Sequence, residues 1–336
     1  MPTRCPVSRT LESFGFGLLV LVAALACAPS LGGWHYADLT AGQGRLAVVR
    51  DSRLSDSPPH MAPYGEGLVL FLCRWSVREP IPVSLPPDAS PRDMRILRMG
   101  LKAWSSAGIG VAFREVEPAE ARLELRFVSG APGSPQGSGN ALADCAIETE
   151  RGRVVLREDR VPAEIRWASI YLNREERDAL GRPVALGDDQ LLGTVLHELG
   201  HALGYSAHPV LGPSIMQRTT DEVRKIGARV AGGAGFSDPN LSALYALPRG
   251  VVVGQLKLPP AQVRLFARFD RAAREHGLKG PYSRVGDSRA RFFYRGARGA
   301  PFALRFGAWR EDIVRPGRLA LQPNAAAAAL LKSGGN

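Results

Sequence analysis

The stretch that most constrains this chain reads H-E-L-G-H-A-L-G-Y-S-A-H and places three histidines within twelve residues. His197 and His201 are four residues apart, a spacing that puts both side chains on one face of a helix. Two imidazoles so arranged can bind one Zn²⁺, and Glu198, one step round the helix, can reach a water on the metal. Gly204 is suited to end the helix in a left-handed turn, after which His208 can return as a third ligand. The segment therefore predicts a site for one catalytic Zn²⁺.

The same segment has the pattern of an amphipathic helix. Its apolar residues recur at helical spacing: Leu191, Leu192, Val195, Leu196, Leu199 and Leu203. Asp188 or Asp189 is suited to be the N-cap. A solvated or core cluster of histidines is the alternative, and an H-E-x-x-H motif has odds of roughly one in a hundred of arising by chance in such a chain. The helix pattern, the glycine and the third histidine together favour the metal site.

The motif, followed by Ser214-Ile215-Met216, resembles the metzincin zinc peptidases, and most of all their matrixin branch. The resemblance implies that His197, His201 and His208 bind zinc. It implies that Glu198 is the general base and that Met216 lies in a tight turn beneath the metal. The expected fold is then α+β, a zincin-like catalytic domain with a mixed twisted sheet.

One residue departs from the family pattern. Metzincins have two residues between the glycine and the third histidine, whereas three separate Gly204 from His208 here. At the family spacing, the third histidine would stand at position 207, which is occupied here by Ala207, a residue that cannot bind a metal. Because His208 precedes Met216 by the distance that matrixins use, we interpret the difference as a one-residue insertion in the turn.

The implied function is that of a zinc endopeptidase, which hydrolyses peptide bonds through a zinc-bound water with Glu198 as base. A non-catalytic protein on a metzincin scaffold is one alternative, although such a protein has no use for Glu198. A gluzincin-like protease with Glu222 as third ligand is the other. The sequence does not predict the peptide specificity, the physiological substrate or the oligomeric state.

Four segments are expected along the chain: a signal peptide at 1–30, a linker or short pro-segment at 31–67, a catalytic domain at 68–248 and a basic region at 249–336. The second segment is rich in Gly, Pro, Ser and Asp and shows little periodicity. Its two histidines, at positions 35 and 60, are expected to be solvated.

The first residues have the pattern of an export signal. Arg4 and Arg9 precede an apolar run, 14–26, that is too short to span a membrane comfortably. The run ends in a small-x-small cleavage site, and no later stretch is long and apolar enough to cross a bilayer. Secretion or a periplasmic location is the first interpretation, a lipoprotein anchored at Cys27 the second, and an uncleaved anchor the third.

Outside the signal region the cysteines are Cys73 and Cys145. In an exported protein, an isolated pair favours a disulfide. The alternative is that Cys73 caps the zinc, as a propeptide cysteine does in animal matrixins. Its surroundings lack the Pro-Arg-Cys-Gly sequence of that switch, so we prefer the disulfide.

Periodicity predicts the order of elements before the zinc helix: a strand at 81–85, a helix at 91–105, and strands at 111–113, 123–127, 154–156 and 170–172. A short helix, 241–247, is expected to close the catalytic domain. The segment 129–140 is expected to be a flexible loop. Because no histidine lies between 61 and 196, we expect no second zinc, whereas calcium binding is left open.

The positive charge of the chain is concentrated near its end. Residues 249–336 contain 17 Lys and Arg against 5 Asp and Glu, a net charge of +12, whereas the whole chain carries +11. A helix at 260–276 and strands at 291–294 and 301–306 are expected there. The region is either a small folded module with a solvated basic face or a docking surface for an anionic partner. Nucleic acid ranks last among such partners because an exported protein meets little of it.

Overall fold

The computed structural model describes residues 53–54, 60–128, 138–151, 153–177, 180–209, 212–286, 289–297, 301–306 and 321–333. The expected signal peptide, Cys27, His35 and most of the expected loop, 129–137, lie outside these ranges. Among the described helices, none combines the length and hydropathy needed to cross a membrane.

The fold is α+β and is built on a mixed sheet of nine strands in the order β16-β15-β14-β13-β6-β9-β5-β3-β4. At one end, four strands run parallel: β3 (Ile81–Ser84), β4 (Phe113–Glu115), β5 (Leu123–Phe127) and β9 (Ala163–Leu172). The long strand β6 (Gly139–Ile147) pairs with β9 in the antiparallel sense. Buried residues alternate with less buried ones in β5 and, apart from a shift at Arg166 and Trp167, in β9, as expected of strands with one face on the core.

The sheet continues into the basic C-terminal region. Strand β13 (Lys279–Gly286) pairs with β6, and it is followed outward by β14 (Arg289–Arg295), β15 (Phe302–Phe306) and β16 (Leu321–Pro323). The division of the chain at residue 248 stays a prediction, but the hydrogen-bonded sheet crosses it.

A second sheet of three strands includes residues of the expected linker. Strand β1 (His60–Tyr64) pairs with β2 (Gly67–Phe71), which pairs on its other edge with β12 (Val252–Lys257). His60 is buried rather than solvated, with 5% of its surface exposed, and its ring nitrogen lies 3.3 Å from the Ser283 hydroxyl. The expectation of a solvated His60 was wrong because Ser283 of a distant segment packs against it, a contact that local composition does not encode.

Two short hairpins complete the strands. They are formed by β7 (Thr149–Glu150) with β8 (Arg153–Val154), and by β10 (Glu175–Arg177) with β11 (Pro183–Ala185). Of the strand expected at 154–156, only Val154 lies in a strand, β8. The one expected at 111–113 begins two residues later.

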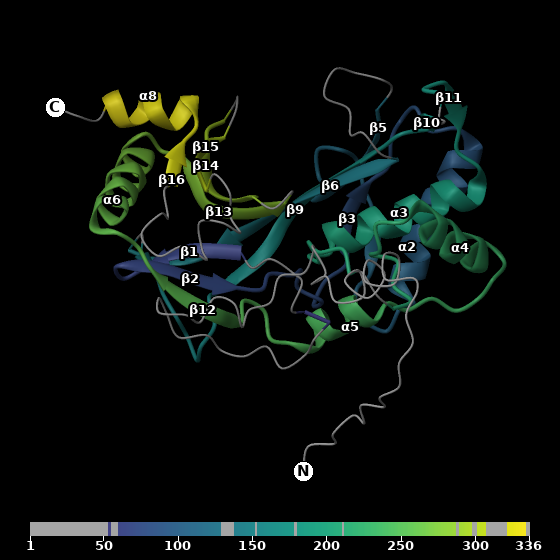
Figure 1. The fold of residues 1–336 in the computed structure, drawn as a ribbon, viewed down its shortest axis with the longest axis horizontal. Helices are drawn as coiled ribbons and strands as arrows, with labels where there is room; N and C mark the ends of the chain where they lie inside the picture. The colour runs from purple at the N-terminus through teal and green to yellow at the C-terminus, as the bar shows by residue number, and fades with distance from the viewer. Residues whose placement is uncertain are drawn as a thin grey trace, which may run out of the picture. The chain divides into compact units, whose positions relative to one another are not determined.

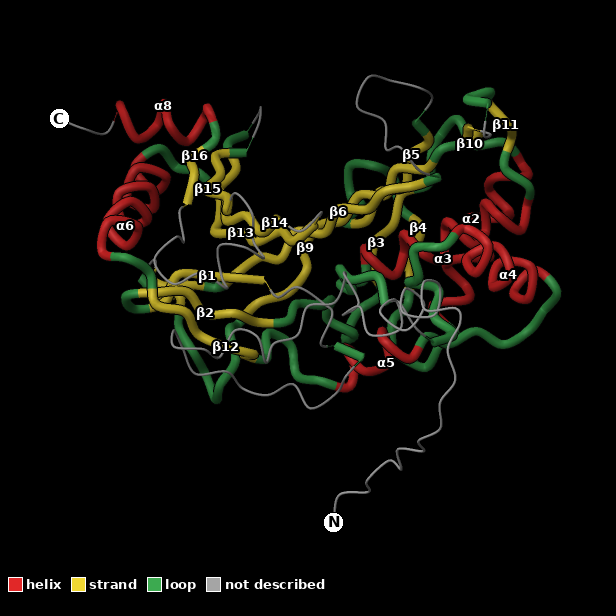
Figure 2. The backbone as a smooth tube through the Cα atoms, in the orientation of Figure 1, coloured by secondary structure: helices red, strands yellow, loops and turns green. Residues whose placement is uncertain are grey.

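Six helices are described, and they form two groups with one helix apart from both (Figures 1 and 2). Helices α2 (Pro91–Ser105), α3 (Asp188–Ala202) and α4 (Thr220–Ala231) lie at the end of the sheet that holds β3 and β5. Helices α6 (Pro260–Glu275) and α8 (Ala325–Ser333) lie at the end that holds β14 to β16. The short α5 (Pro239–Ala246) follows the first group in the chain.

Helix α3 is held between its neighbours by close contacts. The indole nitrogens of Trp75 and Trp104 each donate a hydrogen bond of 2.9 Å to a carbonyl of α3. On the α4 side, Gly193 and Gly227 allow the two backbones to touch, because a β-carbon at either position would overlap with the opposite main chain. Most residues of α3 are buried, and these contacts fix its position against α2 and α4.

The N-cap of α3 differs from the prediction. Gly187 occupies that position without a side-chain hydrogen bond, and Asp188 and Asp189 lie in the first turn. Asp188 instead accepts hydrogen bonds from Arg92 and Arg95 of α2. The Asp188 carboxylate thus pairs with these two arginines and does not cap α3. In the first turn of the helix it also interacts favourably with the helix dipole.

Cys73 and Cys145 are joined by a disulfide that connects the segment before β3 to β6. With a sequence separation of 72 between the two cysteines, the chain-entropy model expects a double replacement by serine to lower the free energy of unfolding by about 4 kcal/mol. Denaturant titration of the non-reduced protein measures this loss, and reductant should produce the same loss in the wild type but not in the variant. Two reactive thiols in the unfolded, non-reduced wild type would contradict the bond.

Candidate metal centre

The three histidines of the motif converge in the structure. His197 and His201 lie one turn apart on α3, and His208 returns from the following turn. The Nε2 atoms of His197 and His201 are 3.1 Å apart, and that of His208 lies 3.0 Å from His201 and 3.3 Å from His197. These three residues form the group of potential metal ligands found among the described residues.

The ring orientations are set by backbone carbonyls. The Nδ1 atom of His197 lies 2.7 Å from the Ile215 carbonyl oxygen, and that of His201 lies 2.6 Å from the Tyr205 carbonyl oxygen. A carbonyl only accepts hydrogen bonds, so each Nδ1 must carry the proton and donate it. The Nε2 lone pairs are then left free and face one another, which is the arrangement of histidine metal ligands.

Burial keeps these imidazoles neutral. Desolvation lowers the pKa of His197 and lowers that of His201 well below its ordinary value, with the neighbouring histidines adding to the effect on His201. Burial also lowers the pKa of His208 to about 3, helped by the charges of His197 and Arg218. The neutral imidazole is the form that binds metal ions.

The distances fit a zinc ion. Nitrogen ligands at 2.0–2.1 Å from Zn²⁺ in a tetrahedral arrangement are roughly 3.3 Å from each other. The observed separations of 3.0 to 3.3 Å are close to that value. Three neutral nitrogens with lone pairs this close repel one another unless a cation lies between them, so the donor set suits a metal ion.

The turn between the second and third histidines depends on Gly204. Its φ of +119° lies in the region that favours glycine, and a β-carbon there would lie 2.5 Å from the Cys73 carbonyl oxygen. The extra residue of this turn is thus accommodated, and it is His208, not Ala207, that faces the other two histidines.

Replacing His208 by alanine should lower zinc affinity by more than about 100-fold. Loss of a residue that only orients a metal ligand lowers affinity by up to about that much, and here a proposed ligand itself is removed. The fold should survive, since the histidine lies in a turn at the site and not in the hydrophobic core. Metal competition titration measures the affinity, and far-ultraviolet circular dichroism measures the fold. His276→Ala, a histidine at the end of α6, is the matched control and should bind zinc normally. Normal affinity in His208→Ala would show that this side chain is not a ligand.

Glu222, the alternative third ligand, lies elsewhere. It belongs to α4, and its carboxylate is 3.7 Å from the Lys225 ammonium. It is not among the residues that converge with His197 and His201. The structure therefore does not support the gluzincin arrangement.

The Glu198 carboxylate is buried next to these ligands. It is 6% exposed, and its Oε2 atom has no hydrogen-bond partner among the described residues. Burial raises its pKa to about 8. Gly139, at the start of β6, covers the side chain so closely that a β-carbon there would lie 2.7 Å from the Glu198 Cγ and 2.8 Å from its Oε1. The carboxylate is thus held in a confined space with one oxygen free to interact with a ligand.

Met216 packs directly beneath the ligand helix. It is fully buried, and a β-carbon at Gly200 would overlap with its sulfur atom. Gly200 lies between the two histidines of α3, so the thioether supports the helix at the site. The role beneath a metal ion that the metzincin resemblance implies for Met216 stays a prediction.

The turn that carries Met216 is held by Asp238, which sequence reasoning did not assign to the site. One carboxylate oxygen of Asp238 accepts from the Ser214 hydroxyl at 2.7 Å and from the Ile215 amide at 3.1 Å. The other oxygen caps α5 by accepting from the amides of Asn240 and Leu241. Because the Ile215 carbonyl orients His197, Asp238 is a positioning residue for the centre.

Part of β6 has a free edge beside the centre. On the side opposite to β9, its described partner β13 pairs only with Cys145 and Ala146. The first part of β6, 139–144, therefore has no paired strand on this side within the described parts of the chain. This edge begins at the glycine that covers Glu198, so an extended peptide pairing with it would pass the carboxylate.

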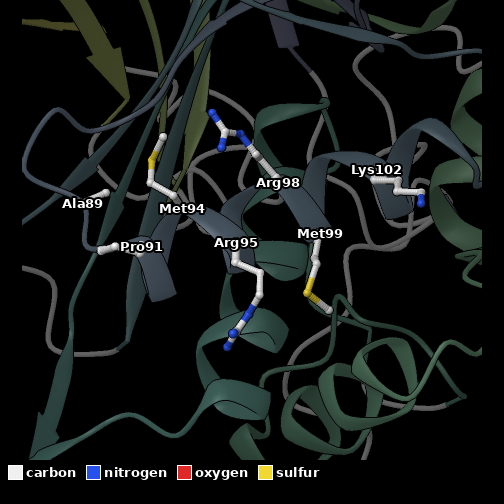
Figure 3. Close-up of a pocket in the computed structure, with 7 residues that line it drawn as sticks. All are labelled: Ala89, Pro91, Met94, Arg95, Arg98, Met99 and Lys102. Atoms are coloured by element: carbon white, nitrogen blue, oxygen red, sulfur yellow. The ribbon is translucent and has the colours of Figure 1, made fainter.

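A separate pocket lies on the outer face of α2 (Figure 3). Its volume is about 660 Å³, and its lining includes Met94, Met99 and Lys102. Two further lining residues are already paired, Arg95 with Asp188 and Arg98 with Glu115. It shares no residue with the histidine cluster and offers neither a metal ligand nor a carboxylate, so it is not part of the centre.

The sequence did not indicate that Gly139 and Asp238 belong to the site. Gly139 lies at the end of a Gly- and Ser-rich stretch, where nothing distinguishes it from its neighbours. Asp238 precedes Pro239 in a sequence typical of a helix start, and this predicts the cap but not the contact with Ser214. Contacts across long sequence separations are what give both residues their roles.

Comparison with known proteins finds solved structures that are weakly similar to this chain, and two of them are structures of myroilysin. No family model and no curated protein matches the sequence. A crystal structure of myroilysin aligns at 16% identity with a TM-score of 0.21, over 52% of this chain and 65% of that chain. Another structure of myroilysin aligns at 17% identity with a TM-score of 0.22, over 55% of this chain and 88% of that chain. Similarity at this level carries no argument about function, so the inferences below depend on the site itself.

Proposed function

We propose that this protein is a zinc-dependent endopeptidase of the metzincin type, in which His197, His201 and His208 hold one Zn²⁺ and Glu198 is the general base. The observation that carries the proposal is the convergence of three Nε2 atoms within 3.3 Å, next to a buried carboxylate with a free oxygen. A structural zinc site has no need of such a carboxylate, since its fourth position is closed by a protein ligand.

Bound Zn²⁺ would polarise the carbonyl of the scissile peptide bond and lower the pKa of a water molecule. Glu198 accepts the proton as this water attacks the carbonyl carbon. It then delivers the same proton to the nitrogen of the departing amine as the peptide bond breaks. Its burial suits this double role, because desolvation makes the carboxylate a stronger base than one in water.

The substrate is proposed to be a peptide or protein segment in extended conformation. Residues 139–144 of β6, which no strand of the described ranges pairs with on this side, offer backbone groups to such a segment in the manner of β-strand addition. Main-chain hydrogen bonds to this edge would align the scissile bond over Glu198. This mode of binding explains why an endopeptidase needs the β6 edge free where it passes the centre.

We also propose that the protein acts outside the cytoplasm, as a secreted or periplasmic enzyme. The disulfide between Cys73 and Cys145 supports this location, because such bonds persist in oxidising compartments. The same bond engages Cys73, so the alternative of a cysteine cap on the zinc has no free thiol to use.

Hydrolysis of casein tests the function. The exported protein should cleave casein, lose activity with a chelator and regain it when zinc is restored in stoichiometric amount. Stoichiometric zinc binding without cleavage of any protein substrate would instead favour the non-catalytic scaffold. Activity that persists without metal would contradict the proposed chemistry.

A further inference from the structure

A second cavity, whose lining includes none of the three histidines, is rich in arginine. Its volume is about 460 Å³, which lies in the range of small-ligand pockets. The cavity is formed by four separate segments of the chain, and five of its lining residues are arginines: Arg74, Arg78, Arg157, Arg160 and Arg249. Glu148 is the acidic residue in the lining.

Four of these arginines are held by hydrogen bonds or ion pairs to neighbouring residues. Arg74 donates to the carbonyls of Leu247 and Trp75 and stacks on the Tyr245 ring, 5.0 Å from its centroid. The other three are anchored by carboxylates outside the lining, in the pairs Arg157–Glu150, Arg160–Glu158 and Arg249–Glu164. The guanidinium groups are therefore positioned before any ligand arrives.

These carboxylates do not balance the positive charge. Within the described ranges, neither Arg74 nor Arg78 has a carboxylate within 4.0 Å. Glu164 is shared by three arginines, Arg122, Arg166 and Arg249. Burial lowers the pKa of Arg74, and the nearby charge of Arg249 adds a smaller contribution in the same direction.

Guanidinium groups in a partly buried cavity select a particular ligand chemistry. Their planar N–H pairs match the oxygens of carboxylate and phosphate, and they bind these oxygens in bidentate fashion. Several such groups facing one cavity favour a ligand with at least two negative charges, since a monovalent anion would leave most of the charge uncompensated.

We propose that this cavity is a binding site for a small multivalent oxyanion, a ligand with a phosphate group or with two carboxylates. It is distinct from the metal centre and goes beyond the proposed hydrolysis. Arg249 is its contribution from the basic region, while the other lining arginines precede that region. The proposed ligand is a small molecule, and the docking of an anionic partner by the basic region stays a separate prediction.

Calorimetric titration of the full exported chain tests the site, with inorganic phosphate, succinate and, as the monovalent control, acetate at constant ionic strength. Metal content is measured before and after each titration so that loss of zinc is not mistaken for binding. We expect phosphate or succinate to bind one to one with a Kd below about 1 mM, and acetate to bind far more weakly. Tighter phosphate than succinate would identify a phosphate ligand, and the reverse order a dicarboxylate.

Variants of exposed residues locate the binding. Arg78→Gln and Arg157→Gln should each weaken it by on the order of tenfold, since each removes a charged hydrogen-bond donor. Glu148→Gln should strengthen it a few-fold by removing the carboxylate that repels the ligand. Arg126→Gln is the matched control, because Arg126 is an exposed arginine paired with a carboxylate two residues away, as Arg160 is.

The response of Glu148→Gln keeps the test independent of folding, because a damaged protein would not bind more tightly. Absence of binding by both dianions would overturn the proposal. So would binding that Arg78→Gln, Arg157→Gln and Arg126→Gln weaken to the same extent, since this would indicate a general effect of net charge.

Discussion

Replacing Glu198 by glutamine should lower kcat/KM for peptide hydrolysis by about 10²- to 10⁴-fold, the range contributed by general acid–base catalysis. Glutamine has nearly the shape of glutamate, so it fills the confined space beneath Gly139. It cannot accept the proton of the attacking water, and this is the only function that the change removes. Zinc affinity should stay within a few-fold of wild type, because the three Nε2 ligands are unchanged.

The measurement pairs casein or peptide hydrolysis with zinc content determined on the same sample. Gln190→Ala, in the first turn of the same helix, is the control for a change on α3 away from the ligands. Equal activity of Glu198→Gln and wild type would show that another group takes the proton. Equal inertness of both proteins, with zinc fully bound, would end the enzyme interpretation.

Replacing Asp238 by alanine should lower the free energy of unfolding by about 3–5 kcal/mol. The buried carboxylate accepts four hydrogen bonds, and its loss leaves the Ser214 hydroxyl and three backbone amides without their acceptor. Each such buried donor costs about 1–3 kcal/mol if it stays unsatisfied, and relaxation recovers part of the sum. The loss of the cap of α5 is included in this figure.

The same change should also lower zinc affinity, by about 10- to 100-fold. Asp238 holds the Ile215 amide, and the carbonyl of Ile215 accepts the hydrogen bond that orients His197. Outer-shell partners of metal ligands have effects of this size when they are lost. Affinity is measured by competition titration at a temperature where the variant is folded, as shown by circular dichroism.

Asp270→Ala is the matched control for this experiment. Asp270 is also buried and hydrogen-bonded, to Tyr294 and Arg274, but it lies on α6 at the other end of the sheet. Its loss should lower stability without changing zinc affinity. If the two aspartate variants lowered zinc affinity equally, the effect would be one of general stability and not of positioning.

Local pattern predicted the elements with strong periodicity. The helix Pro91–Ser105 and the strand Leu123–Phe127 occur with the predicted bounds, because capping residues and alternation are encoded within a few residues. The capping box of Ser90 and Asp93 and the proline at the first helical position explain the sharp start of that helix. The helix that carries His197 and His201 was also predicted, although its N-cap is Gly187.

Pairing between distant segments was not predictable in this way. The strands β1 and β2 fall partly in a segment that composition assigned to a linker, and they are strands because β12, some 185 residues later in the chain, completes their sheet. The continuation of the large sheet from β6 into β13 has the same origin. The open edge of a sheet can pair with any strand of suitable register, and composition does not indicate which strand of the chain pairs there.

The sequence alone determined the chemistry of the centre: two histidines at helical spacing, a carboxylate between them, a glycine that ends the helix and a third histidine soon after. Local geometry suffices for this because the ligands lie within twelve residues. Only the tertiary structure decided that His208 rather than Glu222 joins the other two histidines, that Asp238 holds the turn of Met216, and that the arginines face one cavity. Each of these depends on side chains from distant segments meeting in space, and their meeting is set by the packing of helices and strands.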